Sequence, residues 1–458
     1  MPTPTPSPAA EPVATDVTGA SLLVRAGAAT THLRVLAPVL VVVMVAMLNV
    51  ALHVRTYTLV GPIDELQHID SLYKSPGIVR SGDRIGQDAM REQACRGLDF
   101  DPFELPACGT DVYDPAQFQE NGYNTAAINT PLYYTATRAL GTVVVWLTPT
   151  DSLVTGARLV GGLWLALGLV MAYAAARRLG AHRWTAAAVL VTVACLPSVV
   201  YPSSTVGPDS MTFGVGSAVL LTVLWWRERP TRRWPALAAV SALVLAVKLT
   251  NIVVLVALVL FLLVQLARAW RAGDRRAART PLVAIATVGT TAVVVAGGWS
   301  ALFLALAHGD RHDVPMTLRF AADSLDPQAV LAAWGVWLVP VQGWPLVAGV
   351  GYSALLQSLG VLLVPAGLVA TALFGRPQPG ARLAAWSMVA VGAFGPPAFV
   401  VANYVLQGSV WPVPARYGAS MAATMVVLTI LAVRDRGPRW VLVAVAPAAV
   451  AISVLRLL

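Results

Sequence analysis

Charged residues are scarce in this 458-residue chain: Asp, Glu, Lys and Arg make up 12% of it, whereas 57% is hydrophobic. Soluble globular domains are about one quarter charged, so the composition excludes an ordinary soluble enzyme. Two long runs lack charge altogether, 20 residues over Val35–Val54 and 26 over Pro281–Leu306. Because a helix needs about 20 apolar residues to cross a bilayer, the chain is predicted to be an all-α polytopic membrane protein.

Several chemical motifs are also missing. The sequence has no Gly-rich phosphate loop ending in Lys-Ser or Lys-Thr, no zinc-type Cys/His spacing and no Gly-x-Ser-x-Gly. It therefore offers no support for ATP-driven transport, and no metal and no cofactor is predicted; four polar residues over 64–70 are only a weak basis for a divalent cation. There is no internal repeat, which weakens a carrier built from inverted repeats.

The net charge of +9 is divided along the chain. Residues 61–130 hold 12 of the 23 acids but 5 of the 32 basic residues, a local balance of −7, and the remainder carries +16. Its basic residues form short clusters between apolar runs, and such clusters stay in the cytoplasm. The charge therefore indicates membrane topology, and no nucleic-acid partner is predicted.

The chain is predicted to have four parts and about eleven transmembrane helices, with the N-terminus in the cytoplasm and the C-terminus outside. The parts are a disordered cytoplasmic tail (1–34), a first transmembrane helix (35–57), an extracytoplasmic loop with a juxtamembrane helix (58–157) and a transmembrane helical bundle (158–458). The first apolar run is interpreted as a retained anchor, since it is too long for a signal-peptide core.

Residues 131–147 would be the second span on hydropathy alone. Three basic clusters, at 177–183, 227–233 and 268–279, argue against this. If all three are cytoplasmic, 158–176 runs inward and 131–147 cannot cross. We therefore expect an amphipathic helix on the outer surface with interfacial Tyr133 and Tyr134. By the same rule, 329–348 is expected to be a surface or re-entrant segment.

Two of the three cysteines, Cys95 and Cys108, fall in the predicted outer loop, and Cys195 falls in a span. An oxidising compartment favours a Cys95–Cys108 disulfide, worth roughly 3 kcal/mol in the chain-entropy model. Two free thiols are the alternative.

Asp64, Glu65 and His68 directly follow the first span. In a helix, Asp64 and His68 share a face at i, i+4. Neighbouring carboxylates raise each other's pKa, which suits a proton acceptor. The alternative is that acids simply begin a surface helix, whose N-terminus favours negative charge.

Lys248 lies at the tip of a hairpin whose arms, 234–247 and 252–267, are short for a bilayer of ~30 Å. A Lys recessed in this way is costly unless it meets an anion or lines water, although it could also snorkel to the headgroups.

Three further residues lie at predicted outer ends of spans. The planar guanidinium of Arg416 suits a phosphate, with contact to lipid phosphates as the alternative. Asp209 could act directly or cap a helix. Arg158 could bind substrate or anchor at the interface.

Taken in order, these motifs resemble GT-C-type glycosyltransferases, which are membrane enzymes using polyprenyl-phosphate sugars, and a related group of uncharacterised bacterial predicted membrane proteins. The matching pieces are Asp64-Glu65-x-x-His68, Asn129-Thr130-Pro131-Leu132-Tyr133-Tyr134, Ala157-Arg158-Leu159, Pro208-Asp209-Ser210, Val247-Lys248-Leu249-Thr250 and Ala415-Arg416-Tyr417. One departure is Asn129-Thr130, where a His-Pro pair is common in the mannosyltransferase branch.

The resemblance implies an inverting sugar transfer on the outer side of a bacterial cytoplasmic membrane, from a polyprenyl-phosphate donor to a glycan or lipid acceptor. Asp64 or Glu65 would be the base, with Asp64 favoured. Arg416, Lys248, His68 and Arg158 would bind the donor phosphate, and Asp209, Tyr133, Tyr134 and Tyr417 would line the cavity. The alternatives are a lipid-linked saccharide flippase or carrier, and a non-catalytic envelope-assembly partner that keeps the fold; membrane lipids are the other expected partners.

Overall fold

The computed structural model describes residues 17–98, 104–308, 315–340, 350–375, 380–433 and 436–458. Within these ranges the chain is built from helices, and extended pairing is limited to isolated bridges such as Val60–Leu98. The predicted class of an all-α protein is confirmed.

Long helices form a bundle, and short ones decorate it. The bundle helices are α1 (Val17–Thr56), α5 (Leu153–Arg178), α6 (Arg183–Ala194), α7 (Pro197–Ser204), α8 (Asp209–Glu228), α9 (Trp234–Val247), α10 (Ile252–Arg271), α11 (Arg275–Ala292), η5 (Val293–Gly297), α12 (Gly298–Ala305), α15 (Val350–Phe374), α16 (Ala381–Gln407), α17 (Ala419–Ala432) and α18 (Arg436–Leu457). The others are α2 (Glu65–Lys74), α3 (Gln87–Arg96), η1 (Pro115–Gln117), η2 (Gln119–Gly122), η3 (Thr125–Ile128), α4 (Pro131–Leu147), η4 (Leu249–Asn251), α13 (Pro315–Phe320), α14 (Pro327–Ala332), η6 (Val336–Leu338) and η7 (Ala415–Gly418).

Eight helices of the described chain are long and apolar enough to cross a membrane, or nine if α6 and α7, bent by 64°, are one span. The bend falls at Leu196, whose ψ of 131° is extended because a proline follows. The predicted count of about eleven would require α8 and α9 to cross as well. α9 has only 14 residues, about 21 Å of helix, which is shorter than a ~30 Å hydrocarbon layer.

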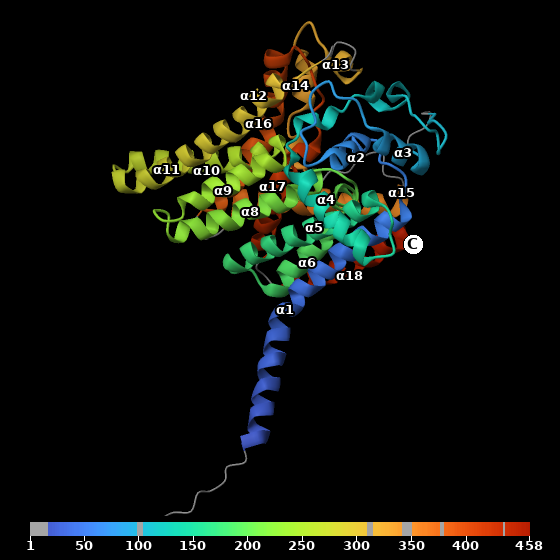
Figure 1. The fold of residues 1–458 in the computed structure, drawn as a ribbon. Helices are drawn as coiled ribbons and strands as arrows, with labels where there is room; N and C mark the ends of the chain where they lie inside the picture. The colour runs from blue at the N-terminus through green and yellow to red at the C-terminus, as the bar shows by residue number, and fades with distance from the viewer. Residues whose placement is uncertain (1–16, 99–103, 309–314, 341–349, 376–379, 434–435) are drawn as a thin grey trace, which may run out of the picture.

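The first helix begins earlier than the predicted span. α1 starts at Val17, whereas the predicted tail covers 1–34, of which 1–16 lie outside the described residues. The sequence over 17–34 is rich in Ala and Leu, which favour helix. Figure 1 shows this part of α1 projecting beyond the other helices.

α4 has the bounds expected for the surface helix and is not among the candidate spans. Its first half buries Tyr133 and Tyr134, whereas Trp146 and Leu147 at its end are 83% and 68% exposed. The membrane side on which it lies stays a prediction. Of the second expected surface segment, α14 and η6 are described and 341–348 lie outside the described residues.

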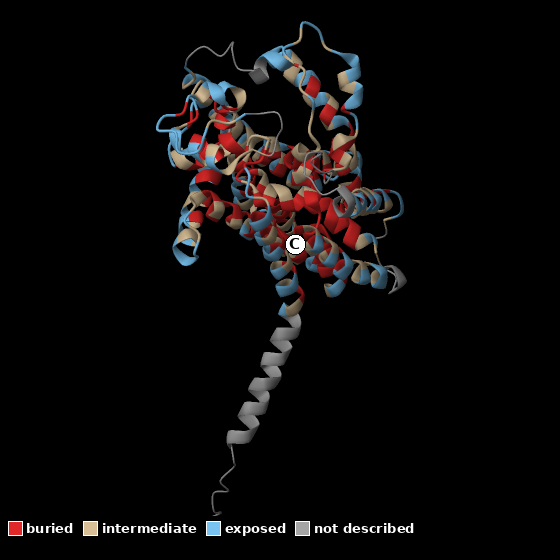
Figure 2. Ribbon diagram, turned by 90° about the vertical axis from the view of Figure 1, so that its right-hand side faces the viewer, coloured by how far each residue is buried: buried red, intermediate tan, exposed pale blue. Residues whose placement is uncertain are grey.

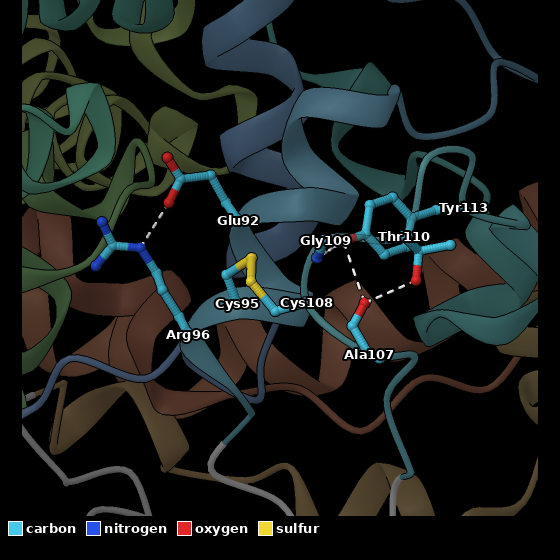
Figure 3. The surroundings of a disulfide bond; sticks show 8 residues. All are labelled: Glu92, Cys95, Arg96, Ala107, Cys108, Gly109, Thr110 and Tyr113. Atoms are coloured by element: carbon cyan, nitrogen blue, oxygen red, sulfur yellow. Dashed lines mark hydrogen bonds and ion pairs between the residues drawn. A yellow bond between two sulfur atoms is a disulfide. The ribbon is translucent and has the colours of Figure 1, made fainter.

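Residues 57–98, 104–130 and 315–338 gather at one end of the bundle, called the loop end below (Figure 1). There Cys95 on α3 and Cys108 form a disulfide with a Cα–Cα distance of 4.5 Å, beside a Glu92–Arg96 ion pair of 2.6 Å (Figure 3). Cys195 is buried and unbridged. Arg96 also donates to Ser152 Oγ (2.7 Å), which ties the disulfide loop to the start of α5.

Buried residues gather in the middle of the bundle (Figure 2), and glycines let four of its helices approach closely. A Cβ on Gly161 of α5 would overlap Ser203 O of α7, and one on Gly216 of α8 would overlap Ser420 O of α17. A larger residue fits at neither position. Small residues at helix contacts are how membrane helices pack tightly, and here they bring the loop ends of α5, α7, α8 and α17 together.

Candidate functional site

A cavity of ≈160 Å³ lies at the loop end, where segments from five parts of the sequence meet. It contains seven of the predicted site residues, which together are Asp64, Glu65, His68, Asp209, Lys248, Arg416 and Tyr417. Asn129, Tyr201 and Thr250 also line it. A cleft with convergent charged groups is the default place to look for a binding site.

Asp64 precedes α2 in a left-handed conformation, with φ 60° and ψ −1°. A non-glycine residue held there is strained by about 1–3 kcal/mol, and such strain clusters at functional sites. Its side chain caps no backbone N–H; instead Asp64 Oδ2 accepts a hydrogen bond from Arg416 Nη2 at 3.1 Å. The carboxylate is 35% exposed, so a ligand in the cavity can reach it.

Glu65, the next residue, is in a different situation. Its side chain is 1% exposed, and Oε1 and Oε2 accept from Arg158 Nε (2.9 Å) and Nη2 (2.8 Å). Each oxygen also accepts one backbone N–H, from Val206 (2.8 Å) and Gly61 (2.6 Å). Glu65 therefore joins α2 to α5 and to the turn before α8, and its oxygens are occupied.

Charges of opposite sign alternate along the cavity. Lys248 Nζ donates to Asp209 Oδ1 at 2.5 Å, Asp209 Oδ2 lies 3.9 Å from Arg416 Nε, and Arg416 continues to Asp64. Tyr417 packs beside both cations, with its ring centre 5.3 Å from Lys248 Nζ and 5.8 Å from Arg416 Cζ. Asp64 and Asp209 thus hold the side chains of Lys248 and Arg416 at the cavity. A bound anion could contact both cations there.

Lys248 directly follows the end of α9, and its predicted depth in the membrane stays a prediction. Lys248 leaves the helix with extended φ and ψ of −162° and 128°, and the buried Asn251 reaches back to Val244 O (3.4 Å). Thr130 Oγ1, just before α4, donates to Ala246 O. The Asn129-Thr130 and Lys248 motifs are therefore neighbours in space.

His68 lies one turn after Asp64, since its N–H donates to Asp64 O at 3.1 Å, but the helix begins only at Glu65, so Asp64 precedes it rather than sharing a helix face with His68. Its Nδ1 is hydrogen-bonded to Tyr134 Oη (2.7 Å), and Tyr133 Oη accepts from Gly207 N (3.0 Å). The two tyrosines thus lie behind the cavity wall and hold it. Burial lowers the pKa of His68 to about 4, helped by the nearby cations and opposed by the two aspartates, so the imidazole is neutral at pH 7.

Trp337 of η6 packs against the turn that contains Arg416. From the sequence, 329–348 was expected only to be a surface or re-entrant segment, and Trp337 was not singled out. The indole is 3% exposed and donates from Nε1 to Pro414 O at 3.3 Å. A Cβ on Gly418 would lie 2.7 Å from Trp337 Cβ, and one on Gly395 of α16 would lie 2.6 Å from the ring. The indole is therefore wedged between α16 and η7, the turn that carries Arg416.

Asp70, one of the weak cation-binding candidates, organises the loop instead. It accepts from Gly86 N (2.8 Å), Asn124 Nδ2 (2.7 Å) and Lys74 Nζ (2.7 Å). Over the residues that the structure describes, no group of three or more His, Cys, Asp or Glu side chains could hold a metal ion.

Comparison with known proteins gives one match. Residues 113–330 match a family described as predicted membrane protein (DUF2142), and no curated protein and no solved structure matches the chain. The matched region includes Arg158, Asp209 and Lys248, whereas Asp64 and Arg416 lie outside it. The chain is thus a multi-pass membrane protein that, over residues 113–330, is similar to the DUF2142 family of predicted membrane proteins.

Proposed function

We propose that the chain is an inverting, GT-C-type glycosyltransferase that moves a sugar from a polyprenyl-phosphate donor to an acceptor hydroxyl. The observation that carries this proposal is the grouping of an accessible, strained Asp64 with Arg416, Lys248 and Asp209 in one cavity. A base beside two cations is what displacement of a phosphate from an anomeric carbon requires.

In the proposed reaction the acceptor oxygen attacks the anomeric carbon as its proton passes to Asp64. The bond between that carbon and the phosphate oxygen breaks, and its electron pair leaves with the polyprenyl phosphate. Arg416 and Lys248 stabilise the growing negative charge, and Asp209 holds Lys248 in place until the phosphate arrives. Protonated Asp64 then releases its proton to water.

The contacts favour different roles for the remaining candidates. Glu65 and Arg158 satisfy each other, so we assign them to positioning rather than to proton transfer or phosphate binding. His68, being neutral, would offer a hydrogen bond but no charge to the donor. Tyr133 and Tyr134 brace the wall, and Tyr417 orients the cations.

The proposed setting is a bacterial cytoplasmic membrane with the loop end outside. Eleven spans, with α8 and α9 both crossing, would place the N-terminus in the cytoplasm and all three basic clusters inside. The disulfide at the loop end suits an oxidising compartment. The acceptor would be a glycan or lipid of the cell envelope.

A lipid-linked saccharide carrier and a non-catalytic assembly partner are the competing proposals. A carrier should bind its substrate near the middle of the membrane between repeated halves, whereas this cavity lies among loops at one end. An assembly partner would have no use for a strained, accessible carboxylate, so Asp64 separates it from an enzyme.

The test is sugar transfer from a lipid-phosphate donor by the purified chain, run beside a vesicle assay for donor translocation. Asp64→Asn keeps the size but removes the basicity, so turnover should fall about 10²–10⁴-fold with donor binding largely kept. Arg416→Ala should weaken donor binding as well. Asp111→Asn, at an exposed residue outside the cavity, is the matched control.

Wild-type turnover by Asp64→Asn would show that the base is misassigned. Translocation without any transfer by the wild type would favour the carrier, and neither activity would favour the assembly partner.

A further inference from the structure

A second cavity, of ≈190 Å³, lies behind the candidate site at the loop end of α1 and α7. The two cavities share Tyr201 and Thr205 in their linings. Gly61 lines the second cavity and Glu65 lines the first. They lie close together, because a Cβ on Gly61 would be 3.0 Å from Glu65 Oε2 and 2.7 Å from Tyr201 Oη. Nothing in the proposed reaction uses this second cavity.

The wall of the second cavity offers no free charge. Arg158 lines it, but all five N–H donors of its guanidinium point to oxygens: Glu65 takes two, and the carbonyls of Tyr57, Thr58 and Leu59 take the rest. An anion would therefore find no open donor. A cation would find no open carboxylate, because both oxygens of Glu65 already accept two hydrogen bonds each.

Three rings form much of the lining. The imidazole of His53 lies 4.5 Å from the Tyr57 ring and 6.0 Å from the Tyr201 ring. His53 is 3% exposed, and its Nδ1 has no hydrogen-bond partner among the described residues. A buried polar atom left in this way is uncommon and calls for a missing partner.

Hydroxyl groups complete the lining. Ser204 Oγ and Thr205 Oγ1 donate to carbonyls of their own helix turn, Val200 O at 2.6 Å and Tyr201 O at 3.2 Å. Each hydroxyl oxygen keeps lone pairs that can accept a hydrogen bond. The cavity thus combines aromatic faces and the apolar residues Leu59, Val60 and Pro62 with a few neutral polar atoms, and a purely apolar ligand would leave His53 Nδ1 unsatisfied.

We propose that this second cavity binds a neutral sugar residue, with its C–H face against the tyrosine rings and a hydroxyl paired with His53. The cavity of ≈190 Å³ has room for a single sugar ring. Such a sugar could come from a glycan or from a glycolipid headgroup. The identification of this sugar as part of the acceptor rests on the proposed function; its binding does not.

The test is the equilibrium binding of neutral methyl glycosides to the full chain in lipid nanodiscs. Binding is measured by saturation-transfer NMR and by the rise in melting temperature. His53→Phe keeps a ring but removes both nitrogens, so the affinity for the glycoside should fall at least tenfold. His182→Phe, the same change at an exposed histidine, should leave it unchanged. Lys248→Ala should keep glycoside binding and lose stabilisation by inorganic phosphate.

Three results would overturn the proposal: no glycoside binding to the wild type, full binding by His53→Phe, or loss of binding in Lys248→Ala, which would place the sugar in the first cavity. If His53→Phe does not fold, the wild type is photolabelled with a methyl glycoside that carries a diazirine group. The proposal then requires labelling of residues 53–62 or 201–205, and labelling only elsewhere rejects the site. Competition by a soluble oligosaccharide or by a glycolipid in the nanodisc distinguishes the two sources. Glycoside binding without any sugar transfer would reject the proposed function alone.

Discussion

At the scale of residues, Asp64 and Glu65 are adjacent acids with opposite surroundings. Asp64 is accessible and held by one hydrogen bond to Arg416 Nη2, whereas Glu65 is buried with both oxygens bonded to Arg158 and to backbone N–H groups. A carboxylate that must accept a proton needs access, and one that braces a fold needs partners. Asp64 is therefore suited to accept a proton, and Glu65 is suited to stabilise the fold, although both side chains are carboxylates.

Glu65→Gln should destabilise the fold, because it leaves the buried Arg158 charge without its counter-charge. Removing one partner of a buried ion pair costs about 3–5 kcal/mol. The melting temperature in nanodiscs should drop clearly for this variant and hardly at all for Asp64→Asn. The double variant Glu65→Gln/Arg158→Met should recover part of the loss, and a double variant less stable than either single one would contradict the assignment.

His68 should make stability depend on pH. Its pKa is lowered to about 4 in the fold, against 6.5 when unfolded, so the unfolded chain binds more protons between these values. Stability contributed by the neutral imidazole is present above pH 6.5 and is lost as pH falls toward 4, up to roughly 3 kcal/mol. The melting temperature should therefore fall less from pH 7 to pH 4 in His68→Gln than in the wild type. Parallel curves would reject a neutral His68.

At the scale of elements, the short segment η6 controls the placement of η7. Trp337 donates to Pro414 O, and its indole fills the space left by Gly395 and Gly418. Arg416 lies within this turn, two residues from Pro414 and two from Gly418. Trp337 of η6 therefore helps to position Arg416 without lining the cavity itself.

Trp337→Ala should let η7 shift and weaken donor binding about tenfold or more, since small displacements of a positioning group are costly. The expected signature is a raised donor KM with a smaller change in kcat, and partial rescue by Trp337→Phe, which restores ring packing without the N–H. Trp334→Ala is the matched control, because Trp334 is 58% exposed in the same segment. Equal losses in Trp337→Ala and Trp337→Phe would point to the hydrogen bond rather than to packing.

At the scale of the whole molecule, the charge pattern and the fold together define two ends. The described parts of the acidic stretch, 61–98 and 104–130, and the disulfide are at the loop end. The basic turns that join α8 to α9 and α10 to α11 project on the left in Figure 1. Positive turns stay in the cytoplasm, so the loop end should face outward.

Cysteine labelling tests this orientation directly. Thr150→Cys, between α4 and α5, should react with an impermeant reagent added outside intact cells, since α4 should not cross. Thr231→Cys, in the exposed turn between α8 and α9, should react only after the membrane is opened. Labelling of both from the same side would reject the topology of this part of the chain. The buried Cys195 and the bridged Cys95 and Cys108 should contribute little background.

The sequence by itself determined the class of the protein and the identity of most cavity residues. Scarcity of charge and long apolar runs are sufficient for a membrane bundle, because the hydrocarbon layer penalises every unpaired polar group. For the same reason Lys248 and Arg416, where apolar runs end, and Asp64, next to a span, were conspicuous. The 131–147 helix was likewise predicted from its apolar run, and in the structure Thr130 caps its start and Pro131 occupies its first turn.

Only the tertiary structure decided which of these residues meet. Asp64 and Arg416 are 352 positions apart, and no local pattern joins them. Their contact depends on how closely helices pack at Gly161 and Gly216, which depends on shape and not on hydropathy. Packing likewise paired Glu65 with Arg158, put Tyr133 and Tyr134 behind the cavity wall, and set Trp337 against Pro414 and Gly418, because each of these contacts joins segments that are distant in sequence.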